Sequence, residues 1–410
     1  MKTTSLFGQA GRISAVAAAL TATFAAAETP TLSNPLISAV LDGHYQSEDR
    51  ILGREKGFGL GETELAISAN IDDMFYGKIT TVLEVHGSET EVELEEAFIQ
   101  TLNLPAGMGI RGGRFLSDIG YLNNQHPHTD SFVERPGVYR AFLGSHYFDD
   151  GLRFNYLAPT DTYWLLGVEG FSGDSLRAAD ESGEREYETV GVYTAYTKIG
   201  GDIGDSSSWQ LGLSYLRNEN GRMSAHEEHG HEEGGHAEEE HGHEEHGHSH
   251  SAAYTGENMY GADFVFKWAP DGNYKYQHLT VSGEFFRIED FMPLEEHHEE
   301  EGHEEEHGHE GHGKDYMQGW YLSSVYQFSP HWSAGIRYGQ VDTQLMHEDH
   351  FDAQKLKETD VMLAWHNSHF STVRLQYTRQ DGTNFDGFTD DNIITLQYVM
   401  TLGAHGAHQF

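Results

Sequence analysis

Trp209-Gln-Leu-Gly-Leu-Ser-Tyr215 alternates large apolar residues with polar or small ones. Successive side chains of a β-strand point to opposite faces, so this segment predicts a strand with one apolar and one polar face. The same period of two recurs in three later segments, at Trp332, Ala334, Ile336 and Tyr338, at Val373, Leu375 and Tyr377, and at Ile394, Leu396, Tyr398 and Met400. The body of the chain therefore predicts an all-β protein of many strands.

The length and flanks of these strands favour a membrane barrel over a soluble sandwich, which would also alternate. Each strand is about ten residues long, the length of a tilted bilayer crossing. Aromatic residues cluster near the strand ends, as in an interfacial girdle. The polar faces carry Gln, Arg, Ser and Gly, which suit a wet lumen. We expect a transmembrane antiparallel β-barrel.

The connections between strands alternate in length. Short ones fall at 72–73, 104–107, 159–161, 271–273, 329–330 and 367–368, and long ones near 47–59, 116–149, 173–187, 218–255, 288–314, 341–356 and 380–390. One connection, from Gly87 to Glu89, is short where a long one is expected. Outer-membrane barrels have short periplasmic turns and long outer loops, so the pattern predicts about sixteen strands with both ends on the periplasmic side.

The two ends of the chain carry export and assembly features. Residues 1–27 read as a signal peptide, with Lys2 and Arg12 before an apolar stretch and with Ala25, Ala26 and Ala27 before the expected cleavage site. The barrel then comprises residues 28–410. Its first expected strand, 36–45, begins too soon after cleavage to leave room for a plug domain. Phe410 at the C-terminus is expected to be recognised by the barrel-assembly machinery of a Gram-negative outer membrane.

Composition excludes several classes of protein. The 410 residues carry a formal net charge of -41 and no cysteine, which rules out disulfide and thiolate sites and argues against nucleic acid as a partner. No apolar run of about 18 residues follows the N-terminal segment, so a bundle of membrane helices is excluded. Motifs of hydrolases, zinc proteases and phosphate-binding loops are absent from the sequence, and no enzyme activity is expected.

Two low-complexity outer segments, 218–255 and 288–314, are rich in histidine and glutamate. Neutral imidazole and carboxylate ligate zinc, and imidazole also suits copper and nickel, so we expect several exchangeable metal sites there. A solvated acidic tract would need no histidine. The histidines are His226, His229, His231, His236, His241, His243, His246, His248 and His250 in the first tract, and His297, His298, His303, His307, His309 and His312 in the second.

A second candidate metal site lies in the long segment 116–149. Asp118, His126, His128 and Asp130 offer two carboxylates and two imidazoles within a short stretch that contains Pro127. In barrels of about sixteen strands, such a loop commonly folds into the lumen and narrows it. The sequence thus predicts a metal-selective constriction, while hydrogen bonding of the two histidines within an ordered loop stays open as the simpler interpretation.

Charged residues on the polar faces support two opposite predictions of ion selectivity. Glu84, Glu93 and Glu95 fall on lumenal positions and favour cations. Arginines lie beside the same loop or on lumenal positions of later strands and keep an anion pathway open: Arg111, Arg114, Arg135, Arg140, Arg153, Arg337 and Arg374.

The run from Gly113 to His128, the two tracts and the ending from Gly403 to Phe410 resemble zinc-responsive outer-membrane proteins with histidine-rich loops. The barrel as a whole is similar to phosphate-selective-type porins. Members of the zinc-responsive group are often labelled TonB-dependent receptors, but the missing room for a plug favours passive diffusion here. The resemblance implies a protein in contact with outer-membrane lipid and lipopolysaccharide, and porins of this size are commonly homotrimers.

Three functions follow as hypotheses. The first is a porin that captures a divalent metal, with zinc ahead of copper or nickel, and lets it diffuse into the periplasm; no cofactor is required. The second is a surface metal buffer anchored by a barrel. The third is a general or anion-selective porin whose histidine tracts bind metal incidentally.

Overall fold

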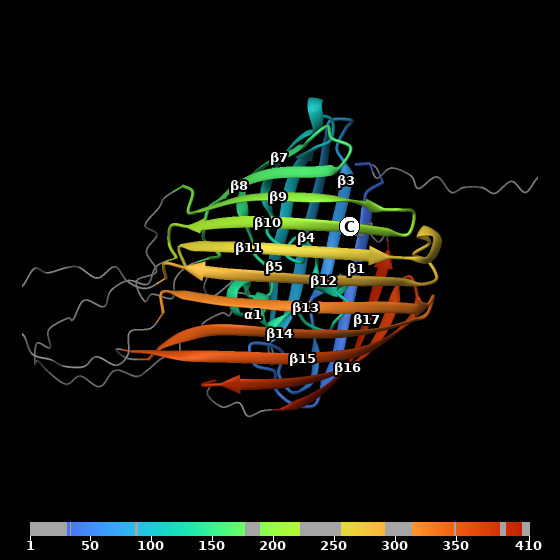
Figure 1. Cartoon of the computed structure of the whole chain (residues 1–410). Helices are drawn as coiled ribbons and strands as arrows, with labels where there is room; N and C mark the ends of the chain where they lie inside the picture. Colours follow the sequence, from blue (N-terminus) through green and yellow to red (C-terminus); the bar gives the residue numbers. More distant parts are fainter. Residues whose placement is uncertain are drawn as a thin grey trace, which may run out of the picture.

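The chain forms a single closed sheet in a computed structural model, drawn in Figure 1. The structure describes residues 31–32, 34–86, 89–176, 189–221, 256–291, 314–347, 350–385 and 391–403. The expected signal peptide, the histidines of both tracts and Phe410 lie outside these residues and stay predictions. Among the described residues, no helix has the length and apolar character needed to cross a membrane.

Strands follow one another around the sheet in chain order, and the pairings between neighbouring strands are antiparallel. Their bounds are β1 (Leu36–Gln46), β2 (Gly57–Leu60), β3 (Thr63–Asn70), β4 (Phe75–His86), β5 (Glu89–Thr101), β6 (Met108–Leu116), β7 (Phe148–Leu157), β8 (Tyr163–Phe171), β9 (Val192–Ile203), β10 (Ser207–Asn218), β11 (Asn258–Trp268), β12 (His278–Glu289), β13 (Tyr316–Ser329), β14 (Trp332–His347), β15 (His350–Ser368), β16 (Ser371–Thr383) and β17 (Asn392–Gly403). Helical turns are short: η1 (Pro105–Gly107), η2 (Pro127–Thr129), α1 (Gly137–Leu143) and η3 (Pro270–Gly272).

The barrel closes where β1 meets β17, with Ser38 opposite Gly403 and Gln46 opposite Thr395. On its other side β1 pairs with both β2 and β3, which lie end to end and act as one interrupted strand. The 17 strands therefore occupy sixteen positions around the ring. This confirms the predicted all-β antiparallel barrel and its strand number, and the start of β1 lies beside the end of β17.

The two faces of the wall have the polarity of a membrane barrel. Leu211 and Leu213 on β10 are 54% and 62% exposed on the outer face. The preceding residue, Gln210, is 8% exposed and lies on the inner face. β16 repeats the pattern, with Leu375 exposed and Gln376 fully buried. A soluble barrel would bury the apolar set instead, so this outer surface suits contact with lipid.

The apolar core of the described residues lies inside the barrel, where the side chains of one loop pack against those of the wall. We call residues 117–147, between β6 and β7, the constriction loop. Its helix α1 packs on the inner face of β13, β14 and β15, as Figure 1 shows. Val138 of α1 approaches Gly319 so closely that a Cβ there would lie 2.7 Å from it. The expected inward fold of this segment is thus confirmed.

One predicted long loop is wrong. The segment 341–356 was expected to be an outer loop, but β14 continues to His347 and β15 begins at His350. Backbone pairing between the two strands, from Val341 opposite Leu356 to the hairpin end, extends both beyond the barrel rim. Ladder hydrogen bonds satisfy the backbone there, although the residues are polar enough for a loop.

Candidate functional site

The constriction loop is closed at its base by Asn123. The side-chain Nδ2 of Asn123 donates to the carbonyl oxygens of Ser117 at 2.8 Å and of Tyr147 at 2.9 Å, and its Oδ1 accepts the Tyr147 N–H at 2.7 Å. Asn123 is fully buried. The side-chain amide of Asn123 thereby joins the first and last residues of the loop. The two ends of this 31-residue segment are thus held together.

A carboxylate of the wall holds the loop across the lumen. Glu284 of β12 accepts hydrogen bonds from the hydroxyls of Tyr139 and Tyr321, each at 2.7 Å. It also accepts the backbone N–H groups of Tyr121 at 2.7 Å and Leu122 at 3.2 Å. Four donors on one buried carboxylate fix both the beginning of the loop and its helix against the wall.

The turn that carries the two predicted histidines is set by Pro127. A residue before proline is restricted to extended backbone, and His126 has φ -77° and ψ 137°. The turn is closed by Thr129, whose hydroxyl donates to the His126 carbonyl oxygen at 2.8 Å. The rings of His126 and His128 stack with centroids 5.8 Å apart. Both imidazoles therefore project together toward the wall formed by β3, β4 and β5.

Two wall carboxylates face these imidazoles because β5 contains a β-bulge. Thr80 of β4 pairs with Glu96 and Thr81 with Leu94, so Glu95 is an extra residue in the ladder. A bulge shifts the alternation by one position. As a result Leu94 and Ile99, five residues apart, are both exposed on the outer face, and Glu95 and Glu96 are both buried inside, 1% and 3% exposed. The lumenal position expected for Glu95 is confirmed; the side chain of Glu84 lies outside the described part.

A second irregularity adds two more carboxylates. Gly43 of β1 pairs with Leu60 and Val40 with Glu64, so two residues of β1 stand opposite three, among them Glu62. Glu64 is 4% exposed, and Glu62 is close enough to Glu64, Glu95 and His146 to interact electrostatically. Four carboxylates thus gather on one patch of the inner wall.

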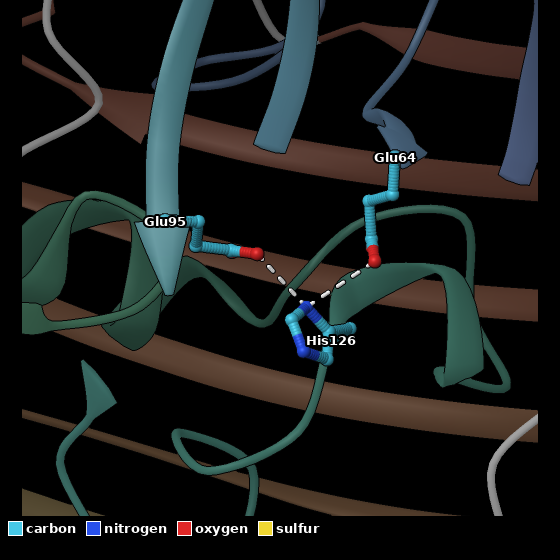
Figure 2. A group of neighbouring side chains, drawn as sticks. All are labelled: Glu64, Glu95 and His126. Carbon is cyan, nitrogen blue, oxygen red and sulfur yellow. Dashed lines mark ion pairs between the residues drawn. The ribbon is translucent and has the colours of Figure 1, made fainter. Parts of the chain in front are cut away.

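His126 lies at the centre of this group, as Figure 2 shows. Its Nδ1 is 2.9 Å from Oε2 of Glu95 and 3.4 Å from Oε2 of Glu64. Its Nε2 is 2.9 Å from Oε2 of Glu96 and 3.0 Å from Nζ of Lys78, which itself pairs with Glu96. His128 makes a neighbouring contact, with Nδ1 at 2.5 Å from Oε1 of Glu64.

A third imidazole, His146, joins from the end of the loop. The helix α1 ends at Gly144 in the left-handed conformation, and Ser145 follows with φ 87°. This sharp reversal brings His146, 4% exposed, to Glu95, with 2.6 Å between Nε2 and the second carboxylate oxygen, Oε1. A non-glycine residue at such a φ is strained, and strained residues cluster at functional sites.

The carboxylates determine the charge of the imidazoles. Burial by itself would lower the pKa of His126, but the carboxylates of Glu64, Glu95 and Glu96 outweigh it and raise this pKa well above its ordinary value. For His146, burial is likewise outweighed by Glu95, and the pKa is raised. The cluster therefore requires positive charge close to Glu95 and holds it as protons when no other cation is present.

The two predicted aspartates of the loop do not join the histidines. Asp118 accepts a hydrogen bond from Nζ of Lys198 on β9 at 2.6 Å. Burial opposes the ionised form of Asp118, but Lys198 prevails and the pKa is lowered. Asp130 pairs with Arg135 inside the loop at 2.8 Å. Both carboxylates are thus engaged by cations of their own, and the side chains that gather around His126 are a different set from the one grouped by proximity in sequence.

The predicted arginines lie at the wall but are largely matched by acids. Arg337 pairs with Asp360 at 2.8 Å, Arg153 with Glu169 at 2.5 Å and Arg140 with Glu358 at 2.7 Å. Arg114 pairs with Asp150 at 2.9 Å on the outer side, and Arg111 and Arg374 donate to Gln100 and Gln397. These guanidiniums thus face carboxylates or amides of the described residues.

Sequence reasoning missed Glu62, Glu64, Glu96, Lys78 and His146 as members of the site. A signal was present for the glutamates, since an acidic pair such as Glu95-Glu96 interrupts an otherwise regular alternation. The contacts between the wall glutamates and the loop histidines arise from the fold, and no local sequence pattern predicts them.

Comparisons with known proteins agree with the barrel. No protein-family model matches the chain. An uncharacterized protein of Aquifex aeolicus (strain VF5) is 27% identical over 401 residues, which cover 91% of this chain and 74% of the relative. Similar solved structures are OmpF of Salmonella typhi, in complex with daunomycin (10% identity, TM-score 0.53, 90% of this chain and 97% of the other), and the outer-membrane channel DcaP of Acinetobacter baumannii (11%, 0.52, 90% and 96%). A third is an anion-selective porin from Comamonas acidovorans, which is 9% identical with a TM-score of 0.51. This match covers 90% of the present chain and 99% of that porin. The chain therefore has the fold of outer-membrane porins.

Proposed function

We propose that this protein is an outer-membrane porin that captures divalent metal, with zinc as first candidate, on its histidine-rich outer segments and lets it diffuse through an acidic lumen into the periplasm. The observation that carries the proposal is the lumenal cluster at His126. There the constriction loop, which narrows the passage, presents imidazoles to four wall carboxylates.

Electrostatics supports passage of cations. The patch gathers the carboxylates of Glu62, Glu64, Glu95 and Glu96, and Lys78 together with the protons on His126 and His146 balances their charge until a metal cation takes the place of those protons. Rings and patches of carboxylates select cations in pores, because an anion would be repelled where the passage is narrowest. The outer tracts add glutamates and neutral imidazoles, which raise the local concentration of a metal ion before it enters.

A general or anion-selective porin is the second candidate function. The inward-facing Arg337 and Arg374 favour it, at 4% and 6% exposure, and so does the likeness in fold to an anion-selective porin. A barrel that serves only as an anchor for a metal buffer is the third, and it would conduct no ions.

Reversal potential in a planar bilayer across a salt gradient, with and without micromolar zinc, separates these functions. A cation-selective current that zinc partly blocks supports the proposal. A matched variant replaces the fifteen tract histidines with asparagine, which keeps length and charge, and should lose capture while it keeps selectivity. An anion-selective, zinc-indifferent current supports the second function, and absence of conductance supports the third.

A further inference from the structure

We infer that Glu64, Glu95 and His126 form a discrete site for a divalent metal ion that joins the constriction loop to the barrel wall. One ligand atom from each of the three lies within 4.8 Å of the others. Figure 2 shows both carboxylates directed at the imidazole. The inference deepens the proposed function by locating where an ion is held in the lumen, but binding at this site does not depend on permeation.

Nδ1 of His126 lies within ion-pair distance of both carboxylates but forms no hydrogen bond of acceptable geometry with either of them. Nδ1 of His126 and Oε2 of Glu95 form no hydrogen bond of acceptable geometry among the described residues, although the two atoms lie 2.9 Å apart. The other carboxylate oxygen of Glu95, Oε1, faces Nε2 of His146 at 2.6 Å. Glu95 is 1% exposed. Buried polar atoms normally form hydrogen bonds, so Nδ1 of His126 and Oε2 of Glu95, which face each other without one, indicate the place of a cation.

His126 is also oriented from behind as metal-bound histidines are. The ring nitrogen opposite the site, Nε2, is 2.9 Å from Oε2 of Glu96. A carboxylate that accepts the proton of one ring nitrogen fixes the tautomer and leaves the other nitrogen as a ligand. Lys78, 3.0 Å from the same Nε2, pairs with Glu96 and balances the charge of that carboxylate.

The donor set narrows the class of ion. Two carboxylates and one imidazole, without thiolate, suit zinc, manganese or nickel more than calcium or copper(I). Three protein ligands leave a position open, which is typical of sites whose ion exchanges. Because the ligands come from β3, β5 and the constriction loop, a bound ion would fix the loop at its present distance from the wall and would lie in the path of other cations.

Crystals of the full chain grown with zinc, measured at the zinc absorption edge, test the site separately from the outer tracts. We expect an anomalous peak about 2.0–2.2 Å from oxygens of Glu64 and Glu95 and from Nδ1 of His126. The peak should vanish in E95Q and in H126N, and it should persist in the matched control H366N, since His366 of β15 contacts Ser333 and Thr372 instead.

Two outcomes would overturn the inference: no peak in the full chain, or a peak that persists in both E95Q and H126N. H126N leaves the wall unchanged, so it remains informative if E95Q does not fold. The outcomes also differ from those of the bilayer experiment. A peak at His126 in a zinc-indifferent, anion-selective protein would keep the site and reject the proposed function. Zinc-sensitive cation currents without a peak would do the reverse.

Discussion

Arg50 and Asp360 are 310 positions apart in the sequence, and inside the barrel Nη2 of Arg50 donates to Oδ1 of Asp360 at 3.0 Å. The same guanidinium donates to Glu134 at 3.1 Å and to Glu358 at 2.9 Å, and it is 2% exposed. One cation of the first outer segment thus joins the constriction loop to β15.

Removal of this cation should destabilise the barrel strongly. R50M removes one cationic partner from three buried carboxylates, of which Glu358 keeps Arg140 and Asp360 keeps Arg337. Loss of one member of a buried ion pair costs about 3–5 kcal/mol. Urea unfolding in lipid vesicles measures the change. The control is K56M, because Lys56 pairs with Glu48 on the surface, where such pairs contribute about 0–1 kcal/mol. Equal midpoints for the two variants would contradict a role for the buried network.

The same network predicts a loss of stability in acid. Burial would raise the pKa of Glu134, but Arg50 and Arg140 prevail and lower it from 4.5 to about 2. A lowered folded-state pKa stabilises the folded protein above the unfolded value, and this contribution is lost as pH falls from about 4.5 through 2. It amounts to roughly 3 kcal/mol. Urea midpoints measured against pH should fall more steeply for the wild type than for E134Q, and parallel curves would disprove the assignment.

The sequence predicts the barrel better than it predicts the site. Alternation at positions such as Trp209 to Tyr215 depends only on neighbouring residues and on the two environments of a strand, so strand number and orientation follow from it. The partners of His126 come instead from strands 31 and 62 positions earlier, at Glu95 and Glu64. Asp118 and Asp130 are closer in sequence but are drawn away by Lys198 and Arg135. Long-range charge pairing decides the site, and a single sequence does not reveal it.

Loss of the wall anchor Glu284 should open the passage. E284A removes the acceptor of two tyrosine hydroxyls and two backbone N–H groups, and bonds to a charged group contribute about 1.5–3 kcal/mol each. The loop should then leave its position, and single-channel conductance should rise and become noisier. E289Q, on the same strand but paired with the exposed Arg287, should conduct as the wild type does. Unchanged conductance in E284A would show that the loop is held by other contacts.

A charged residue on the outer face should destabilise the barrel. L213R places an arginine on an outward position that is 62% exposed, which costs about 2–4 kcal/mol if the position lies near the middle of the bilayer. The conservative L213M should unfold as the wild type does. Urea titration in vesicles compares the two, and identical midpoints would mean that this face does not meet lipid.

Zinc capture by the outer tracts should depend on pH. Histidine with an ordinary pKa of about 6.5 is mostly neutral and coordinating at pH 7.5 but protonated at pH 5. Equilibrium binding of zinc to the full protein should therefore drop steeply below about pH 6. Retention of the same number of bound ions at pH 5 would show that carboxylates, and not imidazoles, hold the metal.

Glu95 is the extra residue of the β-bulge in β5, so it contributes a carboxylate to the site without changing which residues of β5 face outward. Leu94 and Ile99 keep their outward positions because the bulge absorbs one position of β5 without a change in the pairing beyond it. A chain shortened by Glu95 alone would restore plain alternation, with Glu96 still inward and the lipid-facing set intact. Different residues of β5 therefore determine barrel assembly and ion binding, so either property can be altered while the other is kept.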